Sequence, residues 1–432
     1  MGGKAILLVT IGFGFILSYI SFNIAGMSTR AVTNMSEYTA STESHNLAVT
    51  GAHVGLAKFY QDTAWFGTMT QDFKGVDNDL GNLLGSFTVS NTDLGGGRAR
   101  LRSVSSYPEY GGGVLHDTVE VFFDTEKYNG FELYAWMSNF EGNLFWVTGD
   151  TIWGRSHSNG NFHINGSPVF MDKATTAKRF DPKPGTGQNQ AVYKNGYEMG
   201  VASINFPPNF AELVNAANSG FGKYYDLPNI YLSLTAGTAS PNDGMVYVRS
   251  SSGGPIIDSA QIGVGGFNGA IVGTGDVHVQ GVLDGQLTIG SLDDIMVEND
   301  VTYQNRNYSS SDDLLGLVAE HNVIIRDNAA NNSNCEIDGS IFCRDGSLLA
   351  ENLTGRPLSG DLKITGSIVM DERGEVGKYA GSTLKRGFYK KFYYDQRLAD
   401  GSIRPPFYPG YWVTRYSIAN WWENVRIPDY RY

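Results

Sequence analysis

The segment AILLVTIGFGFILSYISFNIAGM, from Ala5 to Met27, decides the architecture at the start of this chain. It contains no charged residue, and its roughly 23 apolar-dominated residues are long enough as a helix to cross a hydrocarbon core about 30 Å thick. A cleaved export signal has an apolar core of about 7–15 residues, so this segment is too long for one. Since no proline follows until Pro108, we predict one long helix over residues 1–62, apolar in its first third and amphipathic beyond.

This N-terminus resembles that of type IV pilin-like proteins, and of PilX-type minor pilins in particular. The resemblance is carried by GGKAILLV (Gly2–Val9), by the apolar stretch to about Gly26, and by the small-residue run VTGAHVGLAKFY (Val49–Tyr60). It implies processing by cleavage after Gly2 or Gly3, or a mature chain that begins at Met1. The alternative is a plain signal anchor.

The resemblance also implies a location and partners. Similar proteins sit in the inner membrane until their hydrophobic helices are drawn into the core of a filament, so we expect an exported bacterial protein that ends at the cell surface or in an extracellular filament. Its partners would be further copies of itself, in a homopolymer active in cell adhesion, or other pilins. The residues expected to make the assembly contacts are the apolar side chains Ile6, Leu7, Leu8, Val9, Ile11, Phe13, Phe15, Ile16 and Leu17.

The composition favours extracellular β-structure for the remainder of the chain. Glycine accounts for 54 of 432 residues, charged residues for only 18% and aromatic residues for 12%. Such a mixture is typical of β-proteins with many tight turns. The composition does not suggest disorder, because 41% of the residues are hydrophobic.

Alternating sequences follow the long helix. Gly85–Asp93, Ala99–Tyr110 and Val114–Asp124 read as strands separated by glycines, and in the last of them Val119, Val121 and Phe123 recur with a period of two. We therefore predict a small antiparallel sheet that packs on the C-terminal part of the helix.

From Gly149 the sequence changes to short β-runs punctuated by glycine, as in VHVQGVLDGQLTIGS. Repeated short strands with turns between them are what a parallel β-helix requires; one short helix is expected at Asn209–Ala217. The strings GDTIWGRSHSNGNFHING, GLVAEHNVII and YKKFYYDQRLADGSIRPPFYP resemble an uncharacterised bacterial envelope β-helix family that commonly follows PilX-type N-termini. That family implies architecture and localisation, and no established chemistry.

The two cysteines, Cys335 and Cys343, lie close together in β-like sequence. Export makes a disulfide between them reasonable, so we expect one. The alternative is a pair of free buried thiols. A structural zinc site would need nearby histidines, and His321 is the only one close in sequence.

The C-terminal segment 385–432 differs from the rest in charge. It holds nine Lys/Arg and four Asp/Glu, whereas the remainder holds 23 and 40, and fourteen aromatic residues lie between Phe388 and Tyr432, among them Trp412, Trp421 and Trp422. We expect this tail to cap the open end of the β-helix or to form a contact between subunits. Surface glycans are a further candidate partner, and single-stranded nucleic acid is the least expected one.

No motif predicts catalysis, a cofactor or a metal site. His157 and His163 are separated by an Asn-Gly turn signal, which argues against a shared metal. Acidic pairs such as Asp293 and Asp294 fall at turns, where carboxylates are usual. The segment Asp77–Asn82 begins like a calcium loop but has its glycine at the wrong position.

Together these patterns predict a mainly β protein with a long N-terminal hydrophobic α-helix, a small antiparallel sheet and then a parallel, right-handed β-helix. The predicted divisions are the helix over 1–62, the sheet over 63–148, the β-helix over 149–384 and the basic, aromatic tail over 385–432. The predicted function is structural and non-enzymatic, that of a pilin-like subunit of a type IV pilus or related filament, assembled through its N-terminal helix. The alternative is a membrane-anchored β-helix protein that binds or cleaves surface polysaccharide.

Overall fold

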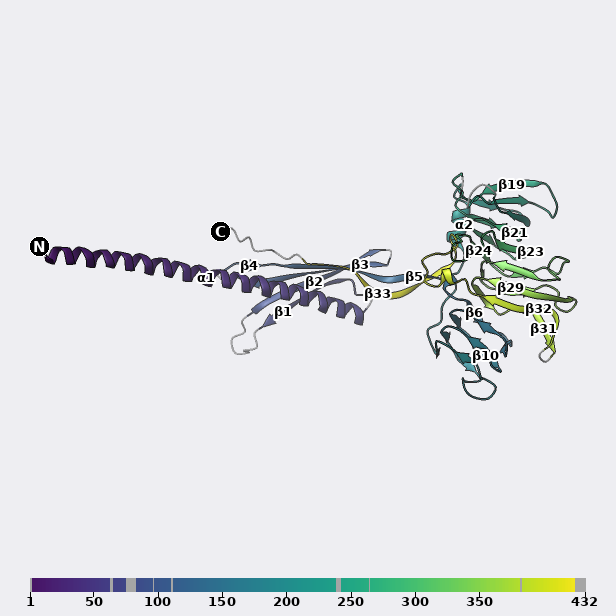
Figure 1. Ribbon diagram of the computed structural model, residues 1–432, viewed down its shortest axis with the longest axis horizontal. Helices are drawn as coiled ribbons and strands as arrows, with labels where there is room; N and C mark the ends of the chain where they lie inside the picture. Colours follow the sequence, from purple (N-terminus) through teal and green to yellow (C-terminus); the bar gives the residue numbers. More distant parts are fainter. Residues whose placement is uncertain are drawn as a thin grey trace. The chain divides into compact units, whose positions relative to one another are not determined.

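A computed structural model describes residues 2–62, 65–74, 83–95, 97–109, 112–237, 242–263, 265–380 and 383–423. The chain forms two compact units (Figure 1). The helix-and-sheet unit comprises Met1–Lys127 and Val413–Tyr432, and the β-helix unit comprises Tyr128–Trp412. The segment Asp77–Asn82, which resembles a calcium loop, and the end of the tail after residue 423 lie outside the described residues.

The helix-and-sheet unit pairs one long helix with an antiparallel sheet. The strand order is β1-β2-β3-β5-β33, with the short β4 paired to β3. The helix and the sheet confirm the predicted long helix and small sheet, and β1 occupies a segment for which no strand was predicted. The bounds are α1 (Gly2–Gln61), β1 (Gly67–Lys74), β2 (Leu83–Gly95), β3 (Arg98–Pro108), β4 (Val114–Leu115), β5 (Thr118–Gly130) and β33 (Gly410–Glu423).

Small residues let the C-terminal part of α1 lie close against this sheet. Ala48 and Ala52 are completely buried. A Cβ atom on Gly51 would lie 2.3 Å from Ser103 Oγ and 2.7 Å from the ring of Phe87, so no larger residue fits there without a shift. The sheet meets the helix with its period-2 apolar face, whose fully buried members include Phe87, Val89, Leu101, Val119 and Val121.

Gly51→Leu is therefore expected to lower the free energy of unfolding of the helix-and-sheet unit by about 1–3 kcal/mol, because the added side chain overpacks the contact. Thermal unfolding in detergent measures this. Gly26→Leu is the matched control on the same helix, since nothing lies within 4 Å of a Cβ atom at Gly26. Equal melting temperatures for Gly51→Leu and wild type would contradict the close packing of helix and sheet.

The β-helix unit is built from short strands stacked in parallel, which confirms the predicted parallel β-helix. One short helix, α2 (Ala211–Ala217), confirms the helix expected at Asn209–Ala217. Each coil contributes one strand to a 10-stranded sheet and one or two strands to the other faces. The coils of the first half are made of β6 (Trp136–Phe140), β7 (Phe145–Val147), β8 (Thr151–Ile152), β9 (Ser156–Ser158), β10 (Phe162–Asn165), β11 (Val169–Phe170), β12 (Ala174–Thr176), β13 (Phe180–Asp181), β14 (Val192–Tyr193) and β15 (Tyr197–Met199).

The second half follows α2 and has longer strands. Its 11-stranded sheet has an antiparallel extension at each end, β17-β18-β19 at one and β31-β32 at the other. The strands are β16 (Lys223–Tyr225), β17 (Asn229–Thr235), β18 (Met245–Arg249), β19 (Ile256–Gln261), β20 (Ala270–Gly273), β21 (Asp276–Leu283), β22 (Gln286–Ser291), β23 (Ile295–Tyr303), β24 (Leu314–Ala319), β25 (Val323–Ile325), β26 (Cys335–Asp338), β27 (Ser340–Cys343), β28 (Leu348–Ala350), β29 (Leu358–Thr365), β30 (Ile368–Glu372), β31 (Gly377–Ala380) and β32 (Thr383–Tyr393).

The 10-stranded sheet shows that the coils are not stacked in chain order. Its order is β15-β12-β9-β6-β30-β27-β24-β22-β20-β16, and all neighbours are parallel. From β16 to β30 successive coils advance toward β6, and from β6 to β15 they advance further in the same direction. Along the axis, the coils from the C-terminal half of the unit therefore come before the coils from its N-terminal half. The two halves meet where Ile368 of β30 pairs with Trp136 of β6.

Two predicted divisions differ from the structure. The first coil begins with β6, ahead of the predicted start at residue 149. The sequence did not reveal this, because β6 joins the β-helix by pairing with β30, which comes more than 200 residues later in the chain. Residues 385–393 belong to β32, which pairs with β29 inside the β-helix, and Phe388 is fully buried there. The predicted separate tail is therefore shared between the two units.

The part of the tail between residues 404 and 411 covers a face of the 10-stranded sheet and does not cap an open end of the β-helix. Tyr408 is fully buried beside Phe342 in a cluster on the outside of this sheet, together with Leu213 of α2. The hydroxyl of Thr288 on β22 donates to the carbonyl oxygen of Pro406. For these residues the expected position at the end of the stack is thus wrong, because their aromatic side chains pack along a face of the sheet.

Cys335 and Cys343 are both free and buried, so the expected disulfide is absent. Cys335 lies on β26 in the 11-stranded sheet, whereas Cys343 lies on β27 in the 10-stranded sheet. The two strands form successive sides of one coil and are not the two arms of a hairpin. The spacing of the cysteines in the sequence did not distinguish these two arrangements. Burial raises the pKa of each thiol to about 12 and keeps both protonated at neutral pH.

Candidate functional site

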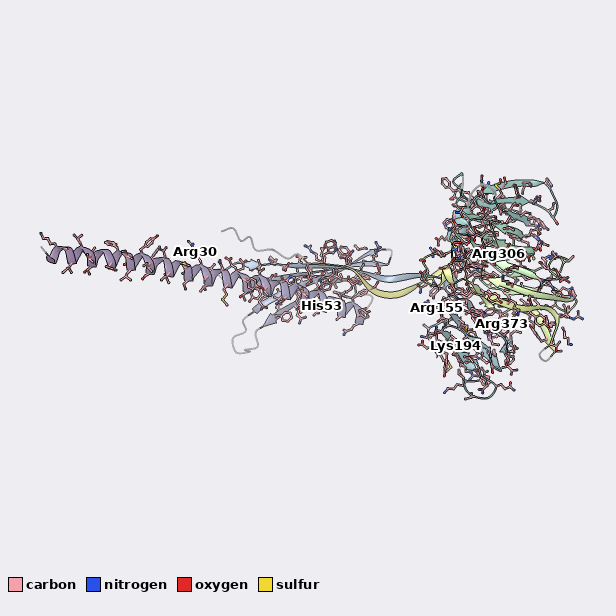
Figure 2. All side chains as sticks on the ribbon, viewed as in Figure 1. Arg30, His53, Arg155, Lys194, Arg306 and Arg373 are labelled. Atoms are coloured by element: carbon pink, nitrogen blue, oxygen red, sulfur yellow. The ribbon has the colours of Figure 1, made fainter. Side chains whose placement is uncertain are left out.

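The N-terminal part of α1 is an uncovered apolar surface. It is long and apolar enough to cross a membrane, and none of its most apolar stretch is buried. All nine predicted assembly residues are exposed, from 48% for Ile11 to 73% for Phe15. Lys4 and Arg30 flank an uncharged stretch between them, and Figure 2 shows Arg30 projecting from the helix. Cationic side chains at the two ends of an apolar helix suit the interfaces of a bilayer.

The remaining residues singled out near the N-terminus and in the tail have distinct surroundings. Gly2 is the first residue of α1, and nothing lies within 4 Å of a Cβ atom built on Gly3. The side chain of Trp412 lies outside the described residues. Trp421 packs on the core of the helix-and-sheet unit with its ring 5.1 Å from that of His53, whereas Trp422 is 63% exposed. Of the two tail tryptophans whose side chains are described, Trp422 is the one that is largely exposed and available to a partner.

A groove of about 880 Å³ runs along the seam where the two halves of the β-helix meet. At this seam β6 and β30 pair within the 10-stranded sheet, but the other faces are discontinuous in the described part of the chain. There, β7 and β8 begin two three-stranded sheets and β31 ends the 11-stranded sheet. The groove lies between the β7–β8 region on one side and β31 and β32 on the other, and we call it the seam groove.

Arg373, which lines the seam groove, belongs to a buried ion pair. Arg373, which follows β30, places Nη1 3.0 Å from Glu141 Oε2, and both side chains are almost completely buried. Glu141 also accepts hydrogen bonds from Trp136 Nε1, at 2.8 Å, and Trp146 Nε1, at 3.0 Å, and a third from Ser138 Oγ. The guanidinium of Arg373 (labelled in Figure 2) lies over the Trp146 ring at 4.0 Å. Each lone pair of the buried carboxylate is thus matched by a donor, as burial of a charge requires.

The walls of the seam groove combine cationic and aromatic side chains. Lys390 of β32 reaches across the groove to Asp150, with 2.9 Å between Nζ and Oδ1. Burial and the nearby positive charge of Arg373 lower the pKa of Lys390, against the influence of Asp150. The lining residues that can contact a ligand are Asn143, Phe145, Thr148, Asp150, Asn165, Glu375, Lys378, Tyr379, Tyr389, Lys390 and Lys391.

The sequence did not reveal this groove. Tyr389, Lys390 and Lys391 were noticed only as part of the basic, aromatic tail, and Arg373 and Glu141 were not singled out. The one local signal is the pair Trp136 and Trp146, placed symmetrically about Glu141 in the sequence. Nothing in the sequence shows that Arg373 joins them.

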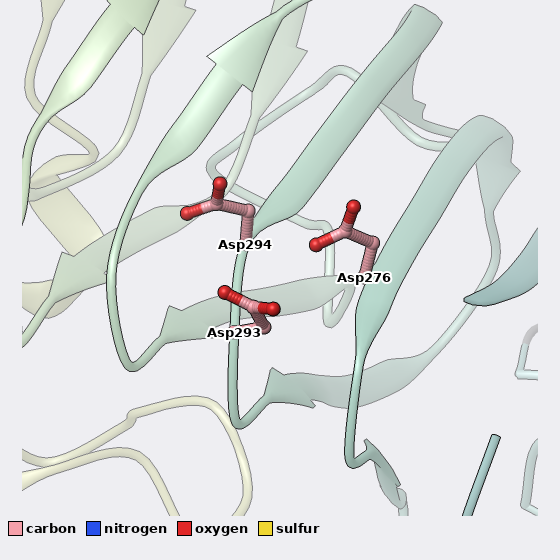
Figure 3. A group of neighbouring side chains, drawn as sticks. All are labelled: Asp276, Asp293 and Asp294. Atoms are coloured by element: carbon pink, nitrogen blue, oxygen red, sulfur yellow. The ribbon is translucent and has the colours of Figure 1, made fainter. Parts of the chain in front are cut away.

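A second polar cluster brings together Asp276, Asp293 and Asp294 (Figure 3). One carboxylate oxygen from each lies within 4.8 Å of the others, and oxygen ligands of this kind suit hard divalent cations. Burial and the charges of Asp293 and Asp294 raise the pKa of Asp276. Asp294 already accepts bonds from the backbone and the side-chain nitrogens of Asn322, as turn-forming carboxylates do. Asp276 was not recognised from sequence, because it lies one coil away from the other two.

The two histidines considered as metal ligands lie on different sheets. His157 on β9 is buried and bonded to Thr175 Oγ1 at 2.8 Å and to Asn159 Oδ1 at 3.0 Å. His163 on β10 lies near Asp181, with 3.7 Å between Nδ1 and Oδ2. Burial lowers the pKa of His157, so it is neutral at physiological pH. His157 thus serves the local hydrogen bonding of the first coils, and His163 lies beside a carboxylate.

Comparison with known proteins gives similarity only at the level of solved structures. No protein family and no curated protein matches the sequence. Among solved structures, the competence-associated pilin ComZ from Thermus thermophilus is similar to this chain with a TM-score of 0.37 and 12% identity, over 89% of this chain and 98% of that one. A similarity at this level assigns neither a fold nor a function.

Proposed function

We propose that this protein is a pilin-like structural subunit, held in the inner membrane by α1 and assembled into an extracellular filament by packing of that helix. The observation that carries the proposal is the difference between the two parts of α1. Ala48 and Ala52 are buried against the unit's own sheet, whereas the apolar residues up to Met27 have no cover within the described residues. An apolar surface of this extent requires a lipid or protein environment.

The helix suits both environments in turn. Its apolar stretch is long enough for a bilayer. Gly14 and Ser18 are four residues apart on one face, and nothing lies within 4 Å of a Cβ atom on Gly14. Small residues at this spacing allow neighbouring helices to approach closely. Copies of the chain can therefore exchange helix–lipid contacts for helix–helix contacts without a change in fold.

Ile11→Lys is expected to abolish assembly. The substitution places an ammonium group in the middle of the apolar stretch, at a cost of at least about 2.5 kcal/mol in a bilayer. We expect loss of the protein from the sheared surface fraction, measured by immunoblot of sheared and membrane fractions. Asn34→Lys is the matched control, because Asn34 is exposed on the polar part of the same helix. Wild-type amounts of sheared Ile11→Lys protein would show that α1 is not the assembly element. Membrane-bound protein that is never sheared from wild-type cells would instead indicate a plain anchor.

A further inference from the structure

The seam groove has the size and the lining of a ligand site. Its volume of about 880 Å³ lies in the upper part of the range of about 300–1,000 Å³ found for small-molecule sites. It is formed by the fold itself, since β6 and β30 pair on one face while the strands behind them diverge. We propose that the seam groove binds an acidic glycan, a saccharide chain that carries carboxylate groups.

The charge of the groove favours an anion. Four cationic side chains line it, against the two carboxylates of Asp150 and Glu375, in a chain whose net charge is −12. The carboxylate of Glu141 is fully buried behind Arg373 and compensates that residue alone. Lys378 and Lys391 are exposed and have no ion-pair partner among the contacts of the described residues. Carboxylates of a ligand in the groove would meet these two cations, which the protein leaves uncompensated.

Aromatic rings on both walls supply apolar contact area. Phe145 is 48% exposed on one side, and Tyr379 and Tyr389 are 45% and 44% exposed on the other. Half-exposed rings in a concave site are large, rigid contact surfaces for the apolar faces of sugar rings. Their positions on strands β7, β31 and β32 fix them in place without a ligand.

The polar groups favour a saccharide over a nucleic acid. Asn143, Thr148 and Asn165 offer amide and hydroxyl groups that both donate and accept, as sugar hydroxyls require. Asp150 and Glu375 accept hydrogen bonds from hydroxyls but repel a polymer with a phosphate at every nucleotide. A carboxylated saccharide, with hydroxyls between its charges, satisfies both kinds of group.

Isothermal titration of the detergent-solubilised full chain with trigalacturonate tests the proposal. Binding is expected for this probe, whereas its carboxyl-reduced, neutral counterpart and an oligothymidylate of similar length should bind more weakly. The double variant Lys378→Glu/Lys391→Glu is expected to weaken binding of trigalacturonate by roughly tenfold or more. Tyr379→Ala/Tyr389→Ala should weaken binding of both saccharides, since it removes contact area and no charge.

The matched controls lie in the same unit but outside the groove. Lys194→Glu and Phe221→Ala change exposed side chains there and should leave the affinity unchanged. Near-UV circular dichroism checks that each variant is folded, and if one double variant unfolds, the other decides. Absence of binding at millimolar trigalacturonate, equal binding of the neutral saccharide, or tighter binding of oligothymidylate would each overturn the proposal. None of these outcomes depends on assembly, so the glycan site and the filament role are tested separately.

Discussion

Arg373→Ala is expected to lower the free energy of unfolding of the β-helix unit by about 3–5 kcal/mol, because it leaves the buried carboxylate of Glu141 without its charge partner. The substitution also removes the guanidinium from the Trp146 ring, 4.0 Å away. Urea unfolding followed by tryptophan fluorescence measures the effect, since Trp136 and Trp146 report on the same site.

Two further variants separate this effect from a general loss of packing. Glu141→Gln combined with Arg373→Met removes both charges and keeps an amide oxygen as an acceptor for the buried donors around position 141. It should recover part of the loss, because no buried charge is left without its partner. Lys173→Ala breaks an exposed pair with Glu198, in which both side chains are about half exposed, and should change stability by only about 0–1 kcal/mol. If Arg373→Ala behaved like Lys173→Ala, the seam would not depend on this pair.

Glu132→Gln is expected to remove a pH dependence of stability. Glu132 is 1% exposed, and burial raises its pKa from the ordinary 4.5 to about 7, against the charge of Arg404. The folded protein therefore holds a proton that the unfolded chain releases. The contribution of Glu132 is most favourable below pH 4.5 and is lost as the pH rises through about 7, by about 3 kcal/mol in total.

Unfolding free energies of wild type and variant at several pH values between 4.5 and 8 check this expectation. The variant should gain stability relative to wild type as the pH rises and should level off above pH 7. Glu212→Gln, an exposed carboxylate on α2, is the control and should follow wild type at all pH values. A constant difference between Glu132→Gln and wild type across this range would show that Glu132 is ionised throughout.

Local patterns predicted the local structure correctly. The uncharged run from Ala5 to Met27 predicted α1. The alternation of Val119, Val121 and Phe123 predicted a strand with one apolar face, and that face is buried. The glycine-punctuated runs indicated parallel coils because each coil is formed within a short stretch of chain. Such patterns arise from the side-chain period of a helix or strand and from the residues that turns require. Both can be read directly from a sequence.

Features that join distant residues escaped prediction. The pairing of β6 with β30, the ion pair of Glu141 with Arg373 and the seam groove all depend on which coils become neighbours. The disulfide prediction failed for a related reason, since Cys335 and Cys343 are close in sequence yet lie on two faces of one coil. No periodicity encodes the order of coils along the axis.

The stacking order of the coils has a consequence for how the chain reaches its native state. In a chain that emerges from its N-terminus, β6 appears long before β30, and the edge of β6 that will pair with β30 stays open until residue 368 arrives. Closing such a long loop is entropically costly, and non-local pairing of this kind slows folding. An open strand edge is also prone to pair with the wrong partner. Until the final coil docks, the first coils thus remain vulnerable to aggregation and proteolysis, and correct folding depends on keeping that interval short.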